Sequence, residues 1–222
     1  MTLRAYGQGD LARSLAEDRL LPLLAKHPED GKFASHEWLM KFPAKRMIWD
    51  DLYGDLLERE GLRILDVGGG YSALTRELAR RHDYTLLDIM AHDAHEEVAK
   101  RAKEAGFRWD AADWKDAAPE DYDLVIANDL FPNVDQRLEA FLAAYRPRAG
   151  ALRFSLTAYD TDRFYKVKRV DADEVLFIRP WGSAMLSAAL SAAVPGAVLP
   201  ALPEGATTLF SNGRAVYRLF LP

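Results

Sequence analysis

The chain has 222 residues, of which 49% are hydrophobic, and a formal net charge of −5 at pH 7. It contains no cysteine, which excludes disulfides, thiolate metal ligands and thiol nucleophiles. The acidic balance counts against general nucleic-acid binding, which relies on a basic surface, and no stretch has the about 18 apolar residues of a membrane span. We therefore expect a cytoplasmic, soluble protein with neither a membrane nor a nucleic-acid partner, while its oligomeric state stays open.

The first part of the chain has the pattern of helices. Leucines recur at helical spacing between Asp10 and Lys26, and a second helical region is expected from about Ser35 to Glu60. Pro43 should interrupt it, because proline removes a backbone donor. We interpret residues 1–60 as a helical cap or lid segment, followed by one main domain over residues 61–222.

From Leu62 onward, short apolar runs alternate with helical patterns. The strand-like runs are "RILDV", "YTLLD", "FRWDA", "DLVIAN" and "LRFSL". Strands separated by helices predict a parallel sheet with right-handed crossovers. An insertion is expected at about residues 159–181, and "ATTLFSNGRAVYRLFLP" places two strand-like runs around Asn212-Gly213, a strong hairpin signal.

The most informative stretch is "LRILDVGGGYSALTRELA", an apolar strand, three glycines and an amphipathic helix. This arrangement presents backbone N–H groups to a nucleotide-like ligand. Gly68, Gly70 and Ala73 satisfy the G-x-G-x-x-G/A pattern of dinucleotide-binding domains, and Asp88 follows at the distance expected for ribose binding. The same letters also fit the S-adenosylmethionine (SAM) pocket of methyltransferases.

Three observations favour SAM over a dinucleotide. Asp66 stands two residues before Gly68, where a carboxylate suits the amino group of SAM better than a pyrophosphate. The chain after the glycines leaves no room for a separate substrate domain, and an antiparallel ending is not expected of a two-fold mononucleotide-binding sheet. A short-chain oxidoreductase using NAD(P) stays as the alternative, although a Tyr-x-x-x-Lys dyad is missing after the fourth strand.

The motifs "ILDVGGGYS", "YTLLDIM", "WDAADW" and "DYDLVIANDLF" resemble motifs one to four of the class I SAM-dependent methyltransferases. The resemblance spans about Leu62 to Pro222, with one departure, since Ser72 stands where the family has its third glycine. It implies an α/β three-layer sandwich, with a seven-stranded, mostly parallel sheet that ends in an antiparallel C-terminal hairpin. It also implies SAM as cofactor and methyl transfer as activity.

The resemblance assigns cofactor contacts residue by residue. Asp66 would anchor the amino group of SAM, Asp88 would accept both ribose hydroxyls, and Asp113 would bind the adenine amino group. Asp88 is also the residue whose role we expect to be separable from folding. The full set of residues expected at the cofactor is Asp66, Gly68, Gly69, Gly70, Asp88, Ile89, Asp113, Trp114 and Asn128.

A positioned base is useful if the acceptor is a hydroxyl, because its proton must leave. His36 is one candidate, since the segment before the first strand often folds over the cofactor pocket in this family. Asp129, which ends the fourth strand, and Tyr159, after the fifth, are the others. A binding protein of this fold without turnover is a further alternative.

Two basic clusters suggest an acceptor with a phosphate or carboxylate group, because Lys and Arg bind such groups by charge-assisted hydrogen bonds. We take Lys45, Arg46, Arg163 and Lys166 as the substrate-binding candidates; solvated helix and strand faces are the other reading. The expected acceptor is a small molecule with an O or N nucleophile, such as a sugar, a sugar nucleotide or a natural-product intermediate. No metal is expected, because the family's adjacent Asp-Asn pair is missing from "TAYDTDRF".

Overall fold

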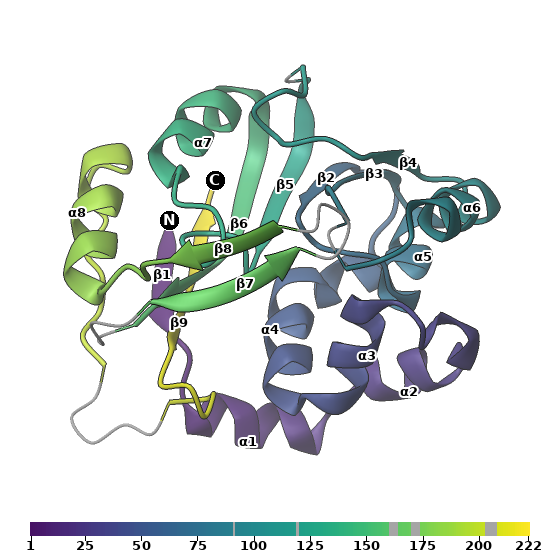
Figure 1. The fold of residues 1–222 in the computed structure, drawn as a ribbon, viewed down its shortest axis with the longest axis horizontal. Coiled ribbons are helices and arrows are strands. Elements are labelled where there is room, and N and C mark those ends of the chain that lie inside the picture. Colours follow the sequence, from purple (N-terminus) through teal and green to yellow (C-terminus); the bar gives the residue numbers. More distant parts are fainter. Residues whose placement is uncertain (91, 119, 160–163, 170–173, 203–207) are drawn as a thin grey trace.

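The computed structural model describes the chain except for residues 91, 119, 160–163, 170–173 and 203–207. Its centre is a seven-stranded sheet in the order β1-β9-β6-β5-β2-β3-β4 (Figure 1). The strands are β1 (Thr2–Ala5), β2 (Arg63–Val67), β3 (Asp83–Leu87), β4 (Arg108–Asp110), β5 (Tyr122–Asn128), β6 (Ala149–Ala158) and β9 (Ala215–Leu221).

The middle of the sheet is parallel. β2 pairs in parallel with both β3 and β5, β3 with β4, and β5 with β6. The five predicted apolar runs form these five strands, with "FRWDA" reduced to the short β4. Because the carboxyl ends of parallel strands meet at one edge, the loops that follow β2, β3, β4 and β5 gather there, which is where open α/β sheets bind ligands.

The last strand has a different partner from the one predicted. β9 is antiparallel, as expected, but its two neighbours are β6 and the N-terminal β1. A strand has only two edges, so β9 has none left for a hairpin partner before Asn212-Gly213. Residues 208–214 form turns and irregular chain, and Ala206 and Thr207, the first two residues of the predicted first hairpin strand, lie outside the described residues. The hairpin is therefore wrong, and the N-terminus supplies the seventh strand.

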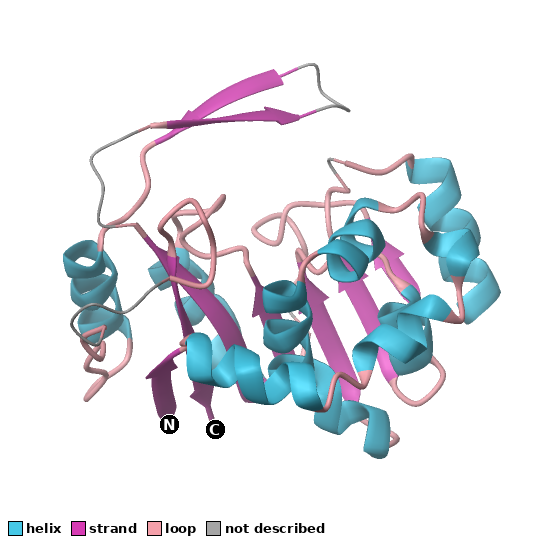
Figure 2. Ribbon diagram, turned by 90° about the horizontal axis from the view of Figure 1, so that it is seen from below, coloured by secondary structure: helices cyan, strands magenta, loops and turns pink. Residues whose placement is uncertain are grey.

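Helices cover both faces of the sheet and complete three layers (Figure 2). The described helices of eight or more residues are α1 (Gln8–Ala16), α3 (Ala34–Lys41), α4 (Pro43–Tyr53), α6 (His95–Ala105), α7 (Leu138–Tyr145) and α8 (Ser183–Ala193). Shorter ones are α2 (Leu20–Ala25), α5 (Ala73–Ala79), and the 3-10 turns η1 (Pro28–Asp30), η2 (Gly54–Glu58) and η3 (Arg146–Arg148). Pro43 separates α3 from α4, as predicted.

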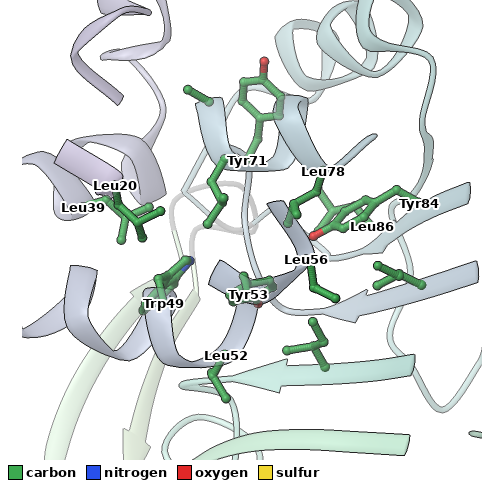
Figure 3. Close-up of a cluster of buried hydrophobic side chains, with 14 of the residues drawn as sticks. Leu20, Leu39, Trp49, Leu52, Tyr53, Leu56, Tyr71, Leu78, Tyr84 and Leu86 are labelled. Atoms are coloured by element: carbon green, nitrogen blue, oxygen red, sulfur yellow. The ribbon is translucent and has the colours of Figure 1, made fainter. Parts of the chain in front are cut away.

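Two buried clusters lie on opposite faces of the sheet because strand side chains alternate. Ile64 joins a cluster with side chains of α2 to α6, part of which Figure 3 shows. Leu65, the next residue, joins a second cluster with α7 and α8. Leu52 and Tyr53 of α4 belong to the first cluster, so the helices of residues 1–60 share a core with the sheet, and β1 is part of the sheet itself.

The expected insertion contains a separate two-stranded antiparallel sheet of β7 (Tyr165–Arg169) and β8 (Glu174–Ile178). Figure 2 shows it standing apart from the main sheet, beyond the end where the carboxyl-edge loops lie. Among the described residues, none of the helices combines the length and the apolar character that crossing a membrane requires.

Candidate active site

A cavity of about 1020 Å³ lies at the carboxyl edge of the sheet. Its floor comes from the loops after β2, β3, β4 and β5, and α3 and α4 cover it. At one end it is lined by the loops after β3 and β4, and at the other by Asp129, Asn212 and Arg214. Arg214 precedes the antiparallel β9, so it reaches the same edge as the ends of the parallel strands.

The glycine loop has no room for side chains. Gly68 and Gly70 have φ of +71° and +67°, a region that residues with a Cβ rarely adopt. A Cβ on Gly70 would lie 1.9 Å from Ser35 Oγ, and one on Gly69 would lie 2.1 Å from Asp66 Oδ2. All three glycines line the cavity, so the loop forms a cradle for a ligand that approaches the backbone closely.

Asp66 lies beneath this cradle rather than in it. Its carboxylate accepts hydrogen bonds from Tyr53 Oη at 2.9 Å and from Tyr84 Oη at 2.6 Å, and its side chain does not line the cavity. Burial raises the pKa of Asp66 to about 7. The structure thus shows Asp66 supporting Gly69 from below, whereas the contact with a cofactor amino group stays a prediction.

Asp88 combines two roles. Its Oδ2 accepts the Gly70 N–H at 2.8 Å, and its Oδ1 accepts the Met90 N–H at 2.7 Å. Burial raises the pKa of Asp88, although these two backbone hydrogen bonds oppose the shift. Asp88 and Ile89 line the cavity, and each carboxylate oxygen has a further lone pair for a ligand hydroxyl. Because Asp88 also holds the glycine loop, its binding role is not separable from folding, contrary to the expectation from the sequence.

Asp113 is part of an ion-pair cluster at the far end of the cavity. Arg137 Nη2 lies 2.8 Å from Asp113 Oδ2 and 2.6 Å from Asp135 Oδ2. Burial alone would raise the pKa of Asp113, but its hydrogen bond and charge interaction with Arg137 outweigh this and lower it. Trp114 donates its indole N–H to Asp135 at 2.6 Å and packs against Phe141. Its ring is therefore mainly a core element that also borders the cavity.

Asn128 lines the cavity and has one unsatisfied group, which is buried. Its Oδ1 accepts a hydrogen bond from the Ser155 hydroxyl at 2.6 Å. Its Nδ2 is buried, and none of the described residues lies close enough to accept a hydrogen bond from it. A buried donor without a partner is costly. An acceptor atom of a bound ligand would relieve that cost, and Asn128 does line the cavity.

Asp129 is held by two cations. Lys45 Nζ lies 3.0 Å from Oδ2, and Arg214 Nη1 lies 2.9 Å from Oδ1. Burial alone would raise the pKa of Asp129, but the charges of Lys45 and Arg214 outweigh this and lower it. The carboxylate is therefore ionised and weakly basic, which argues against the predicted role of Asp129 as general base.

His36 does not face the cavity. It is 1% exposed, and its Nδ1 accepts the N–H of Ala73, the first residue of α5, at 3.3 Å. Burial lowers the pKa of His36. The positions that α3 presents to the cavity are Ala34, Ser35 and Trp38. The prediction of His36 as a catalytic base is wrong in this structure, because the face of α3 that carries His36 packs against α5 and not against the cavity.

Tyr159 is also buried outside the cavity lining. Asn212 Nδ2 lies 3.3 Å from its hydroxyl oxygen. Burial raises the pKa of Tyr159, although the charge of Arg214 opposes the shift. A tyrosine with a raised pKa is a poor base near neutral pH, so Tyr159 does not fit its predicted role.

The predicted substrate residues separate into three cases. Lys45 lines the cavity as expected. Arg46 points elsewhere, since its guanidinium bonds Asp18 and the carbonyl of Leu39 at 2.7 Å each. Lys166 is exposed on β7 and does not line the cavity, and Arg163 lies outside the described residues.

Other residues that line the cavity around Lys45 and Asp129 were not predicted from the sequence as site residues. They are Trp38, Phe42, Trp49, Phe177, Arg179 and Arg214. The first three stand in the "SHEWLMKFPAKRMIWDDLY" segment, whose aromatic content is a usable signal. Arg214 could not be placed, because its position depends on how β9 enters the sheet.

One acidic cluster outside the cavity has the spacing of a metal site. His27, Glu29 and Asp30 offer ligand atoms within 4.8 Å of one another. Arg76 lies among them, with Nη1 2.8 Å from His27 Nδ1 and Nη2 2.7 Å from Asp30 Oδ2. The guanidinium thus already supplies the positive charge there.

The comparisons with known proteins agree with this geometry. Residues 65–147 match the family described as "Methyltransferase domain". Residues 65–147 are therefore a methyltransferase domain, and the fold around them is that of class I methyltransferases. Four predictions are confirmed: the family, the mostly parallel seven-stranded fold, the methyl-transfer activity and SAM as cofactor. A search of curated protein sequences finds no match.

Two solved structures share the fold over most of their length. One is 1,6-didemethyltoxoflavin-N1-methyltransferase from Burkholderia thailandensis with S-adenosylhomocysteine (SAH), at TM-score 0.52 and 18% identity, covering 99% of this chain and 92% of that one. The other is the N-methyltransferase NodS from Bradyrhizobium japonicum with SAH, at TM-score 0.53 and 13% identity, covering 90% and 98%. The chain also matches coclaurine N-methyltransferase at TM-score 0.39 and 21% identity, over 50% of this chain and 36% of that one.

Proposed function

We propose that this methyltransferase transfers the methyl group of SAM to an O or N nucleophile of a small molecule. The observation that carries the proposal is the single cavity that joins the glycine cradle and Asp88 to a second end lined by Asp129, Lys45 and Trp38. A donor and an acceptor bound in one cavity can meet in the line of attack that displacement at a methyl group needs.

The residues present fit SAM. The cradle has no room for a Cβ at Gly69 or Gly70 and a positive φ at Gly68. The carboxylate of Asp88 offers two acceptors for a vicinal diol, and the unpartnered Nδ2 of Asn128 is a donor. We assign the ribose to Asp88, the adenine end to Asp113 and the methionine end to Asn128. When bound, SAM supplies an electrophilic methyl group on a sulfonium.

The chain's own residues then contribute by positioning. Asp129 is ionised and engaged by two cations, and His36 and Tyr159 lie outside the cavity lining. Asp129 is therefore a weak base, and the other two are not placed to remove a proton. We attribute the acceleration to holding the acceptor near the methyl group, an effect that can supply a large part of a barrier reduction. We further propose a sugar, sugar nucleotide or natural-product intermediate as acceptor.

The test is a pair of measurements on the purified protein. Calorimetry should show binding of SAM and SAH but not of NADH or NADPH, since the Asp88 carboxylate lies 2.8 Å from the Gly70 N–H, in the loop that a negatively charged pyrophosphate would approach. Incubation of a metabolite extract with methyl-tritiated SAM should label a small molecule. Binding of NADPH alone would favour the oxidoreductase alternative, and SAM binding without any labelled product would favour a protein that binds SAM without turnover.

A further inference from the structure

Among the described residues, the end of the cavity beyond Asn128 carries excess positive charge. Lys45 and Arg214 both contact the carboxylate of Asp129, at 3.0 Å and 2.9 Å, and their side chains are only 14% and 8% exposed. One carboxylate neutralises only one of two cations. A half-buried site with an uncompensated positive charge favours an anionic ligand, because water screens the charge poorly there.

Lys45 has donors to offer such a ligand, and Arg214 lines the cavity beside it. An ammonium group has three donors, and among the described residues the hydrogen-bond acceptor of Lys45 is Asp129. Lys45 Nζ also lies over the ring faces of Trp38 and Trp49, with centroids at 5.0 Å and 5.3 Å. The Nε of Arg214 is buried and has no hydrogen-bond partner in the described part of the chain.

Aromatic side chains surround these cations. Trp38 of α3, Phe42 at the junction with α4, Trp49 of α4 and Phe177 of β8 line this end of the cavity. Phe42 and Phe177 are 47% and 72% exposed. Large apolar side chains left exposed around a cavity are typical of a ligand site, and four ring systems provide flat surfaces for stacking.

We propose that the methyl acceptor is a planar, apolar molecule with a carboxylate or phosphate group, and that Lys45 and Arg214 bind this group. The proposal rests on the proposed function and names the chemical class of its acceptor. The rings of Trp38, Trp49 and Phe177 hold the apolar body. Asp129 is then a positioning residue, which fixes the two cations in the absence of acceptor and competes with the acceptor for them.

The test uses the full chain saturated with SAH and compares matched probes by calorimetry. The probes are 2-naphthoate, 2-naphthyl phosphate, the uncharged 2-naphthamide, and acetate as the anion without an apolar body. We expect either naphthyl anion to bind about tenfold or more tightly than naphthamide, as for one charge-assisted hydrogen bond, and acetate to bind at least tenfold more weakly still. The tighter of the two naphthyl anions identifies the anionic group.

Three variants separate a binding role from a structural one. Lys45→Met keeps the apolar stem between the two tryptophans and should remove the preference for the anion while leaving SAH affinity within about twofold. Lys41→Met, an exposed position on α3, is the matched control and should change nothing. In Asp129→Asn, the asparagine can adopt the positive φ of 56° found at this position. Loss of the negative charge releases both cations, so naphthyl-anion binding should become about tenfold tighter.

The outcomes are distinct. If SAH itself does not bind, the proposed function fails before the acceptor is tested. If SAH binds but naphthoate and naphthyl phosphate bind no better than naphthamide, or keep their preference in Lys45→Met, the anionic acceptor is excluded. Equal binding of acetate and the naphthyl anions would exclude the apolar body, and weaker anion binding in Asp129→Asn would exclude competition by Asp129.

Discussion

At the scale of single residues, two carboxylates support the same glycine loop from different sides. Asp66 lies beneath Gly69 with both oxygens bonded to tyrosine hydroxyls. Asp88 holds the N–H of Gly70 from the cavity side. The loop is thus fixed before any ligand arrives, which lowers the entropy cost of binding.

The first prediction concerns Asp88→Asn. The amide keeps one acceptor but turns an N–H₂ group toward either Gly70 or Met90, whose N–H groups the carboxylate now satisfies. We expect SAH affinity to fall about 10- to 100-fold, and the free energy of unfolding to fall by about 1–3 kcal/mol. Calorimetry and urea unfolding measure the two effects, and Asp116→Asn, exposed in the neighbouring loop, is the control. Normal stability with weakened binding would show that the loop does not depend on Asp88.

The second prediction concerns the buried Asp66, whose pKa lies at about 7 instead of the ordinary 3.8. Between these values the folded protein retains a proton that the unfolded chain has lost, so Asp66 makes stability fall as pH rises through this window. Asp66→Asn does not titrate. The free energy of unfolding of Asp66→Asn minus that of wild type should therefore be larger, meaning a relatively more stable variant, at about pH 8 than at about pH 5. Urea unfolding of both proteins at both pH values measures this, and an unchanged difference would contradict the raised pKa.

At the scale of elements, the N-terminal strand and α4 are joined through one aspartate. Asp51 of α4 accepts the hydroxyl of Tyr6 at 2.6 Å and contacts the guanidinium groups of Arg4 of β1 at 3.4 Å and Arg218 of β9 at 3.0 Å. This contact connects the edge of the sheet to the helix that carries Lys45. It explains how a strand of four residues, β1, is held at the edge.

The third prediction follows from this contact. Asp51→Asn removes the charge that pairs both arginines, so we expect the free energy of unfolding to fall by about 1–3 kcal/mol. Asp83→Asn is the control, because Asp83 pairs with Arg63 at 3.5 Å with its side chain 72% exposed, and exposed pairs contribute about 0–1 kcal/mol. Denaturant unfolding compares the two variants. An equal, small effect would show that β1 is held by its backbone hydrogen bonds alone.

The same elements show how far the sequence leads. Alternation of apolar runs and helices predicts the five parallel strands, and the glycine loop with Asp88 predicts where a ligand binds. The pairing of β9 could not be predicted, because "TLRA" is too short to stand out as a strand and Asn212-Gly213 gives a hairpin signal without a partner. His36 failed as a prediction because helical periodicity gives the faces of α3 but not which face meets α5 and which meets the cavity.

At the scale of the whole molecule, the site lies where the two cores meet at one edge of the sheet. The α2–α6 core supports the cover that carries Trp38 and Lys45, and the α7–α8 core supports Trp114 and the residues around Leu130. A ligand in the cavity contacts elements that belong to both cores. Its binding should therefore stabilise the molecule as a unit.

The fourth prediction tests this coupling. A ligand that binds only the folded state stabilises it by RT ln(1 + [L]/Kd), about 2.7 kcal/mol at 100 times Kd, and for a chain of this size each kcal/mol raises Tm by about 2–4 °C. SAH at 100 times its measured Kd should thus raise Tm by about 5–11 °C in a single cooperative transition. Differential scanning calorimetry measures this, with NADPH at the same concentration as the control, for which no shift is expected. Asp88→Asn at the same SAH concentration should show a smaller shift, because its higher Kd reduces the ratio [L]/Kd. Two separate transitions with SAH, of which only one moves, would instead show that the cover and the sheet unfold independently.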